Sequence, residues 1–295
     1  MDTKLASGRK PYKDLTFTDD YMFCRILSND LELSRQLLEV ILDKEIGRVE
    51  LADSQHTITI TSDVKSVRFD VYLNDEAGTV FDLEMQALRK PEIPKRSRYY
   101  QSISDIDRLG AGMSYGSLPD MYVIFICTFD PFCKGLPRYE FRNLCIEAPG
   151  IELEDGTRKV FINAKSESKD ISPELRALLD YLCGMEPRSD LTKYISESIK
   201  RAKTDHRWER DYVTFEEKLR EEHKAGKEEG LKEGREEGLK EGKEEGLKEG
   251  REEGLFESVI RLMDKKGLSL EEACDIIGLP VDKYWEHKGN RGAEE

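Results

Sequence analysis

The chain has 295 residues and a formal net charge of −14, with 38% hydrophobic and 37% charged residues. This length allows one domain of ordinary size with appendages. The acidic balance argues against strong nonspecific DNA affinity through bulk charge, so any contact with nucleic acid must come from a local basic patch.

The cysteines and the apolar runs give no sign of export or of a membrane. The six cysteines form no CxxC pair and no Cys/His cluster with zinc spacing. The first residues, MDTKLASGRKPYKD, lack the apolar core of a signal peptide. No run approaches the roughly 18 apolar residues of a membrane span. We therefore expect a cytoplasmic protein in a reducing compartment, without membrane association.

The first half of the chain predicts helices, then strands, then a helix and a buried strand. We expect residues 1–14 to be a mobile leader. Apolar residues recur with the spacing of one helix face through DDYMFCRILSN (19–29) and LELSRQLLEVILDKEI (31–46). The following patterns predict strands at 49–60, 66–73 and 79–86, a helix at 93–112, and a strand buried on both faces at 121–129.

The second half predicts two more strands and then mostly helix. The strands are expected at 139–148 and 158–165, and the helices from Pro173 to Cys183 and from Asp190 to about Glu222. The net charge is −5 over 221–254 and −3 over 255–295, which leaves −6 for residues 1–220. These changes in composition suggest four parts: a leader (1–14), a main domain (15–220), a charged repeat (221–254) and a small helical module (255–295).

Two of the predicted strands bring acidic residues together. In SVRFDVYL (66–73) and TVFDLEMQ (79–86), apolar residues alternate with polar ones, which places the acids on one face. If the hairpin closes symmetrically around NDEAG (74–78), Asp70 lies opposite Asp82 and diagonal to Glu84. Diagonal neighbours lie roughly 7–8 Å apart, so two carboxylates can share one divalent cation. The alternative is a solvent-facing sheet whose acids have no function.

A basic segment follows the hairpin. Residues 89–98 contain five basic residues and one acid. Cations that hold phosphate beside acids that hold metal suit a phosphodiester substrate. The sequence therefore favours a metal-dependent site that acts on DNA.

The order of elements, together with several local motifs, resembles a known family. The motifs are FTDDYMFCRILSN, FDVYLND, FDLEMQ, RSRYYQ and YGSLPDMYVIFICTFDPF. Over about residues 15–165 they resemble the recombination-promoting nuclease and transposase family of the PD-(D/E)XK nuclease superfamily. The resemblance implies an α/β, restriction-endonuclease-like core of helix, three-strand antiparallel meander, helix and strand, followed by a helical, repeat-containing tail.

The resemblance also implies a set of site residues. Asp70 and Glu84 would hold one or two Mg²⁺ ions, with the backbone carbonyl of Met85 completing the shell and Mn²⁺ as a substitute. In the superfamily the third residue is usually Lys, but this chain has Gln86, a residue that the resembled family also commonly carries here. Its amide can orient water but cannot accept its proton at neutral pH. Asp82 is either an extra ligand or, as we favour, an exposed strand-face acid.

Further residues near the predicted site have weaker roles. Either Asp19 or Asp20 could be an accessory acid, although capping of the first helix is favoured for both. In the RSRYYQ motif, two residues match the family pattern and would contact DNA phosphate or brace the acids. Less specific phosphate-binding candidates come from the basic segment. These candidates are Arg98 and Tyr100 from the motif, and Arg89, Lys90, Lys95 and Arg96 from the segment.

The tail combines conflicting propensities. From Gly226, glycine recurs every fourth residue through Gly254, and leucine recurs every eighth from Leu231 to Leu255. Glu, Lys and Leu favour helix, whereas each Gly costs about 1 kcal/mol relative to Ala. The repeat is thus a marginal helix or a flexible spacer, and the alternative that its glycines allow close helix pairing stays open. Residues 255–285 suggest a helix-turn-helix shape, but their acidity favours an interaction module over DNA binding.

These observations lead to one main functional hypothesis and two rivals. The main hypothesis is a magnesium-dependent DNA endonuclease that hydrolyses phosphodiester bonds and promotes recombination or accompanies mobile elements. The first rival is a weakly active or inactive nuclease fold that serves as a DNA- or protein-binding scaffold. The second is a strand-transferring transposase. The sequence leaves the oligomeric state open, with a homo-oligomer among the options.

Overall fold

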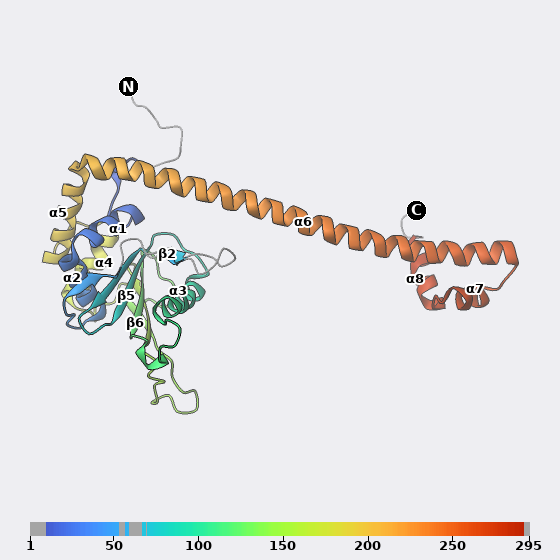
Figure 1. The fold of residues 1–295 in the computed structure, drawn as a ribbon, viewed down its shortest axis with the longest axis horizontal. Helices are drawn as coiled ribbons and strands as arrows, with labels where there is room; N and C mark the ends of the chain where they lie inside the picture. The colour runs from blue at the N-terminus through green and yellow to red at the C-terminus, as the bar shows by residue number, and fades with distance from the viewer. Residues whose placement is uncertain (1–9, 53–56, 59–66, 69, 292–295) are drawn as a thin grey trace, which may run out of the picture. The chain divides into compact units, whose positions relative to one another are not determined.

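The computed structural model describes residues 10–52, 57–58, 67–68 and 70–291 (Figure 1). The chain divides into two compact units, Met1–Phe215 and Glu216–Glu295. In the described parts of the chain, no helix is long and apolar enough to cross a bilayer.

The first unit consists of a mixed sheet with helices on both faces. Its helices are η1 (Tyr12–Asp14), α1 (Asp20–Asn29), α2 (Leu31–Leu42), α3 (Ile93–Arg108), η2 (Tyr115–Ser117), α4 (Pro173–Leu182), α5 (Asp190–Thr204) and the first part of α6 (His206–Lys266). Its strands are β1 (Val49–Leu51), β2 (Thr57–Ile58), β3 (Val67–Arg68), β4 (Val71–Asp75), β5 (Val80–Gln86), β6 (Met121–Cys127), β7 (Arg138–Phe141) and β8 (Thr157–Asn163).

The described strands form a six-stranded sheet in the order β1-β4-β5-β6-β8-β7, and a separate pair, β2 and β3. β1/β4, β4/β5 and β7/β8 are antiparallel, whereas β5/β6 and β6/β8 are parallel. The parallel step from β5 to β6 requires a crossover, which α3 provides. The expected mixed α/β class is therefore present.

Helices cover both faces of the sheet around β5. Figure 1 shows α1, α2, α4 and α5 on one side and α3 on the other. Phe81, Leu83 and Met85 of β5 pack in the core cluster on the first side, whereas Val80 packs with Ile93 of α3. Because strand residues alternate between faces, Asp82, Glu84 and Gln86 point to the α3 side. Every residue of β5 is buried, so the alternative of a solvent-facing acidic sheet is wrong.

The hairpin between β4 and β5 closes one residue later than expected. Gly78 has φ +85°, and the amide of Asp75 donates to the carbonyl of Thr79 at 3.0 Å. A three-residue loop whose last residue is left-handed produces this closure. Moving the turn centre by one residue moves the register by two, so Asp82 pairs with Tyr72 and not with Asp70.

The predicted strands at 49–60 and 66–73 were too long. β1 ends at Leu51, and the next described pair of residues, 57–58, belongs to β2 in the other sheet. Likewise β3 and β4 lie in different sheets, and Asp70 occupies the bend just before β4. Residues 53–56, 59–60, 66 and 69 of these two predictions lie outside the described residues. Alternation of side chains does not reveal where a strand changes partners.

The predicted continuous helix after Asp190 was wrong, and the described part of the predicted leader, residues 10–14, is packed. The single helix expected from Asp190 to about Glu222 breaks at Asp205, where the backbone is extended (φ −87°, ψ 105°). The Asp205 side chain accepts a hydrogen bond from the Arg207 amide at 2.8 Å, and a new helix starts there. The expected leader is packed where it is described. Tyr12 is buried, and its hydroxyl donates to the carbonyl of Ala202 at 2.8 Å.

The second unit contains the remainder of α6 and two short helices, α7 (Leu270–Ile277) and α8 (Val281–Arg291). The predicted capping box of Ser269 and Glu272 opens α7, and Gly278 (φ +73°) ends it. The small core of this unit contains Phe256, Val259, Ala273, Cys274, Leu279 and Tyr284.

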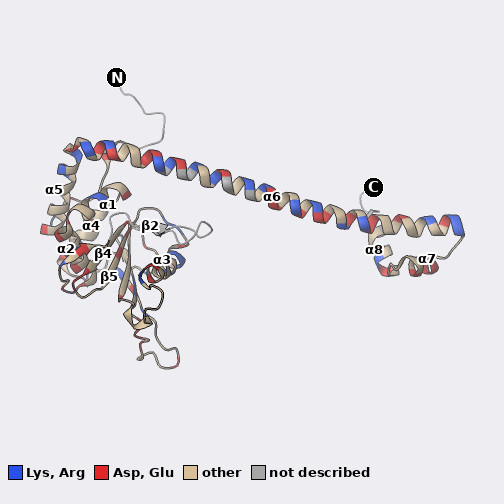
Figure 2. Ribbon diagram, in the orientation of Figure 1, with Lys and Arg blue, Asp and Glu red and all other residues tan. Residues whose placement is uncertain are grey.

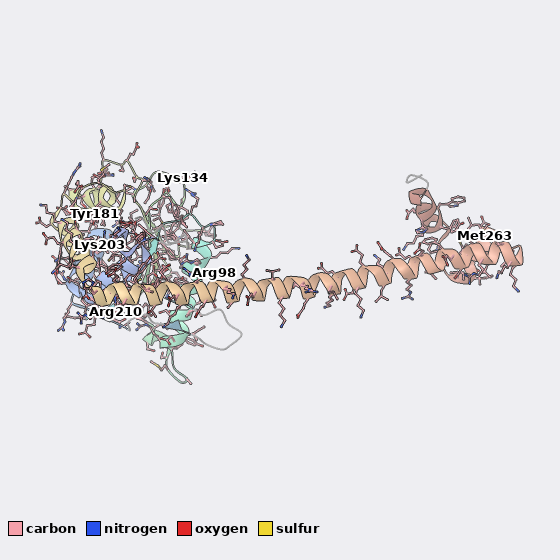
Figure 3. The ribbon with its side chains drawn as sticks, turned by 90° about the horizontal axis from the view of Figure 1, so that it is seen from above. Arg98, Lys134, Tyr181, Lys203, Arg210 and Met263 are labelled. Atoms are coloured by element: carbon pink, nitrogen blue, oxygen red, sulfur yellow. The ribbon has the colours of Figure 1, made fainter. Side chains whose placement is uncertain are left out.

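The repeat itself is helical. Lys and Arg alternate with Glu along α6 (Figure 2), and its side chains stand out from the helix (Figure 3). The repeated leucines stay 65–66% exposed at Leu231, Leu239 and Leu247. An added Cβ at the repeat glycines would meet nothing within 4 Å. Helix in this segment therefore depends on its own propensity and ion pairs, which return only a few tenths of a kcal/mol each.

We predict that replacing Gly230, Gly238 and Gly246 with Ala in the full chain strengthens α6, by about 0.5–1 kcal/mol per site. Circular dichroism at 222 nm should increase and the melting transition of this segment should rise. Gly78→Ala is the control and should destabilise the chain, because its φ is +85°. A loss of helicity in the triple variant would instead indicate that the glycines pack closely against another helix.

Candidate active site

A cleft of about 230 Å³ opens at the end of β5. Its walls come from the start of α1, the bend before β4, the end of β5 and the first turns of α3. The lining residues are Asp20, Asp70, Glu84, Met85, Gln86, Ala87, Leu88, Lys90, Arg96 and Tyr100. The fold thus brings together residues separated by up to 80 positions, among them the two acids that the sequence selected.

The Glu84 carboxylate accepts a hydrogen bond from the Asp70 amide at 3.1 Å through Oε1, and the Asp70 carboxylate accepts one at 3.0 Å through Oδ2 from the amide of Met85, the residue after Glu84. Continuing the β4/β5 register places Asp70 level with Glu84. The two carboxylates are therefore direct neighbours, not the diagonal pair that we expected. These hydrogen bonds hold both groups at one point of the cleft.

The Met85 carbonyl is directed toward the same point. The Gln86 carbonyl accepts from the Thr128 amide on the β6 side. Successive carbonyls of a strand point to opposite sides, so the Met85 carbonyl points toward Asp70. β4 begins at Val71, which pairs with Leu83, so the ladder of β4 ends before it reaches Met85. This carbonyl is consequently placed to serve as a ligand beside the two carboxylates.

Asp82 is fully buried, so the favoured expectation of an exposed strand-face acid was wrong. Among the residues that the structure describes, neither of its carboxyl oxygens has a hydrogen-bond partner. Burial and the nearby charge of Asp70 raise the pKa of the Asp82 carboxyl well above its ordinary value. The covering α3 helix is the physical reason, since it removes water from this face of β5.

Glu84 is under the same constraint. Its side chain is only 3% exposed, and burial, followed by the charges of Asp70 and Asp82, raises the pKa of its carboxyl well above the ordinary range. The neighbouring carboxylates of Asp70 and Glu84 offer the oxygen ligands that a divalent cation prefers. In the described part of the chain, no three His, Cys, Asp or Glu side chains converge into a ready-made cage. An ion here would draw on Asp70, Glu84, the Met85 carbonyl and water.

Arg96 binds the acidic end of β5 from α3. Its Nη2 donates to Glu84 Oε2 at 3.2 Å and to the Tyr100 hydroxyl at 2.9 Å, and its Nη1 donates to Gln86 Oε1 at 2.7 Å. The Gln86 amide uses its other end to donate to the Leu88 carbonyl at 2.7 Å. Gln86 is therefore tied at both ends to the protein, and its immediate contact is a cation.

Of the two candidate acids at the start of α1, only Asp20 lies at the cleft. Asp19 binds Thr16 and Lys10 outside the cleft, and its side chain does not cap the helix. Hydrogen bonds from Lys10 and Thr16 lower the pKa of Asp19 despite its partial burial. Asp20, the next residue, lines the cleft with Asp70 and Glu84. The accessory position, if used, belongs to Asp20.

The basic candidates also divide. Lys90 lines the cleft, whereas Arg89 donates to the Asp130 carbonyl at 2.5 Å and lies over the Phe129 ring. Lys95 and Arg98 are exposed on α3, and Arg98 is labelled on the surface in Figure 3. No described contact joins Arg98 to the acids, so of the two motif residues only Tyr100 braces the site, through Arg96.

Arg96, expected only as one of four weak phosphate candidates, is instead the residue that contacts both Glu84 and Gln86. A signal was available. Arg96 and Tyr100 are four residues apart and so share one face of α3. That face also contains the buried residues Ile93, Ser97, Gln101 and Ser104. A basic residue on the buried face of a helix that covers an acidic strand indicates an inward ion pair.

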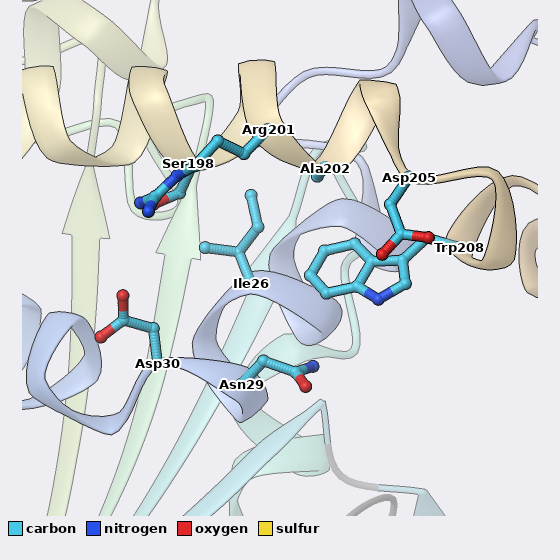
Figure 4. Close-up of a pocket in the computed structure, with 8 residues that line it drawn as sticks. All are labelled: Ile26, Asn29, Asp30, Ser198, Arg201, Ala202, Asp205 and Trp208. Atoms are coloured by element: carbon cyan, nitrogen blue, oxygen red, sulfur yellow. The ribbon is translucent and has the colours of Figure 1, made fainter.

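A second hollow, of about 260 Å³, lies between α1, α5 and the start of α6 (Figure 4). Its charged groups are engaged within the protein: Asp30 accepts from the Tyr194 hydroxyl at 2.5 Å, and Asp205 binds Arg207. The remaining lining residues are Ile26, Asn29, Ser198, Arg201, Ala202 and Trp208. It lacks the crowded acids of the first cleft and is the weaker candidate.

Residues 17–176, more than half of the chain, match the family described as PD-(D/E)XK nuclease family transposase. The chain belongs to this family. No curated protein and no solved structure matches it. Membership in the PD-(D/E)XK nuclease family transposases indicates a nuclease- or transposase-related function.

We predict that Asp82→Asn stabilises the protein without added metal at pH 8, by about 1–3 kcal/mol, because the neutral amide avoids a buried negative charge beside Asp70. Because the folded-state pKa of Asp82 is raised, the folded state binds more protons than the unfolded state above the ordinary carboxyl range. Wild-type stability therefore falls as the pH rises through that window.

The measurement is denaturant unfolding in EDTA between pH 5 and 8. The advantage of Asp82→Asn should shrink as the pH falls. The matched control, Glu50→Gln on β1, is 71% exposed and should change little at any pH. An Asp82→Asn variant that is less stable at pH 8 would mean that the charge of Asp82 is satisfied in the fold.

Proposed function

We propose that this protein is a magnesium-dependent DNA endonuclease that hydrolyses phosphodiester bonds. The observation that carries the proposal is the pairing of Asp70 with Glu84 in a cleft that also presents a backbone carbonyl and cations. Family membership supports a phosphodiester substrate. The roles in recombination or in mobile elements, and a cytoplasmic location, are further parts of this proposal.

In this proposal, Asp70, Glu84 and the Met85 carbonyl hold Mg²⁺, or Mn²⁺ in its place. When bound, such an ion activates water and screens the charge of the scissile phosphate. The protein positions the ligands: hydrogen bonds from the Asp70 and Met85 amides fix the two carboxylates, and α3 excludes water from one side of the site. Lys90 at the cleft, with Lys95 and Arg98 on the exposed surface of α3, supplies local positive charge for DNA backbone despite the acidic chain.

The role first expected for Gln86 changes. Its amide contacts Arg96 and the Leu88 carbonyl, so orientation of water is not its main task in this proposal. In this proposal the chain comprises a nuclease domain over 15–220, a helical spacer over 221–254 and a small interaction module over 255–295. A homo-oligomer is compatible with this plan.

One observation favours the rival scaffold function. The signature lysine is replaced by Gln86, and an uncharged amide lends no positive charge to a phosphate. A scaffold would bind DNA or protein without cleavage. Strand transfer, the other rival, requires a second DNA substrate in addition to the same acids, so hydrolysis needs fewer assumptions.

We predict that purified protein nicks supercoiled plasmid with Mg²⁺ and not with EDTA, and that Asp70→Ala and Glu84→Gln each lower the rate by at least about 100-fold, the scale of losing a group that acts in the transition state. Gel electrophoresis of the nicked product gives the rate. Glu50→Gln serves as the control and should cleave like wild type. Equal cleavage by wild type and Asp70→Ala would refute the site, and no cleavage under any metal condition would favour the scaffold.

We also predict that Mg²⁺ stabilises the wild-type fold, because an ion relieves the repulsion among buried acids. At a Mg²⁺ concentration of 100 times the dissociation constant, the gain is about 2.7 kcal/mol. Differential scanning fluorimetry should show a rise in melting temperature with Mg²⁺ that is lost in Asp70→Ala. A shift that survives in Asp70→Ala would place the ion elsewhere.

A further inference from the structure

The acidic end of β5 requires a cation that its own strand does not provide. Asp82 and Glu84 are buried, Asp70 is half-buried, and the third position of the signature is the neutral Gln86. The signature in the family's name, PD-(D/E)XK, ends in a lysine, and we place Gln86 at that position. Excess negative charge at this point would repel a phosphodiester, so a positive group is needed beside the scissile phosphate as well as beside the acids.

Arg96 occupies the position that would meet this need. Its guanidinium contacts the side chain of Gln86 and that of Glu84, the two residues between which a signature lysine would act. Its side chain is 28% exposed and lines the cleft, so it is accessible to a ligand. Three of the five N–H donors of a guanidinium are used in these contacts and in the bond to Tyr100, which leaves donors for a further anion.

The surroundings of Arg96 favour a fixed, charged guanidinium. Its central carbon lies 5.3 Å from the centroid of the Tyr100 ring and 5.3 Å from that of Phe125. Aromatic faces stabilise a cation at this distance. The Gln86 amide, anchored on the Leu88 carbonyl, presents its oxygen to Arg96. A lysine at position 86 would place its ammonium against Arg96, so the glutamine and the arginine form a matched pair.

We propose that Arg96 is a catalytic residue of this site: it contacts the scissile phosphate and supplies the positive charge that the signature assigns to lysine, and Gln86 is the residue that positions it. The proposal rests on the proposed nuclease function. In this proposal the positive side chain comes from the first turns of α3 and not from β5. The site thus keeps the positive charge of the signature lysine, at a different position in the sequence.

The test removes the positive charge from Arg96 on α3 and then restores it at position 86 on β5. Arg96→Gln should lower kcat for plasmid nicking by at least about 100-fold with KM changed less than about threefold, the pattern for loss of an interaction made in the transition state. Arg96→Lys should keep at least about a tenth of the wild-type rate. The double variant Gln86→Lys/Arg96→Gln should recover at least about tenfold over Arg96→Gln. Arg48→Gln, an exposed arginine before β1, is the matched control.

A binding measurement separates failure of this proposal from failure of the nuclease function. In an Asp70→Asn background with EDTA, which we expect to prevent cleavage, fluorescence anisotropy with a short DNA duplex gives affinity as a function of salt. Adding Arg96→Gln should reduce the slope of log K against log salt by about 0.9, the value for one phosphate contact. The control Arg48→Gln should leave the slope unchanged.

Each outcome either supports or overturns the proposed role of Arg96. Rescue by the double variant supports the proposal, as does the reduced slope even if wild type does not cleave. If folded Arg96→Lys and Arg96→Gln lose equal activity, the double variant gives no recovery and the slope stays unchanged, then Arg96 is a structural brace and the proposal is overturned. If wild type is inactive and the slope is also unchanged, both proposals fail. Circular dichroism verifies the fold of every variant.

Discussion

The site depends on the burial of carboxylates on the α3 side of β5. Moving charged groups out of water is costly, and two of these acids, Asp82 and Glu84, are almost completely shielded. The fold compensates in part with Arg96, which contacts Glu84, while Asp82 is left without a described partner. A protein that retains such a cluster gives up stability at this position, as functional sites commonly do.

The rest of the first unit explains why the cluster can persist. β5 is the point where an antiparallel pairing with β4 meets a parallel pairing with β6, so it is held on both edges. On the opposite face, Phe81, Leu83 and Met85 are anchored in the large core cluster beneath α1, α2, α4 and α5. Because that apolar packing fixes the strand, the side chains of the alternate residues, Asp82, Glu84 and Gln86, must face α3. Core and site are therefore two faces of one strand.

α3 has three roles in this arrangement. It is the crossover that makes β5 and β6 parallel, it covers the acidic face, and it carries Arg96 and Tyr100 to Glu84. The Tyr72 hydroxyl binds Ser104 on the same helix at 2.5 Å and also accepts from Arg108, which ties β4 to α3 farther along. Displacement of α3 would therefore expose the acids and remove their cation together. This coupling makes α3 the element that most directly controls the chemistry of the cleft.

The sequence by itself determined the alternation of side chains along β5 and singled out Asp70 and Glu84 as neighbouring acids. Periodicity and turn residues are local properties, so the alternation along β5, the apolar β6 and the capping box at Ser269 could all be predicted. The tertiary structure decided what depends on distant partners. It set the register through the left-handed Gly78, buried Asp82 beneath α3, chose Asp20 over Asp19 for the cleft, and paired Arg96 with Glu84. Burial and long-range contacts belong to pairs of segments, and no single segment contains that information.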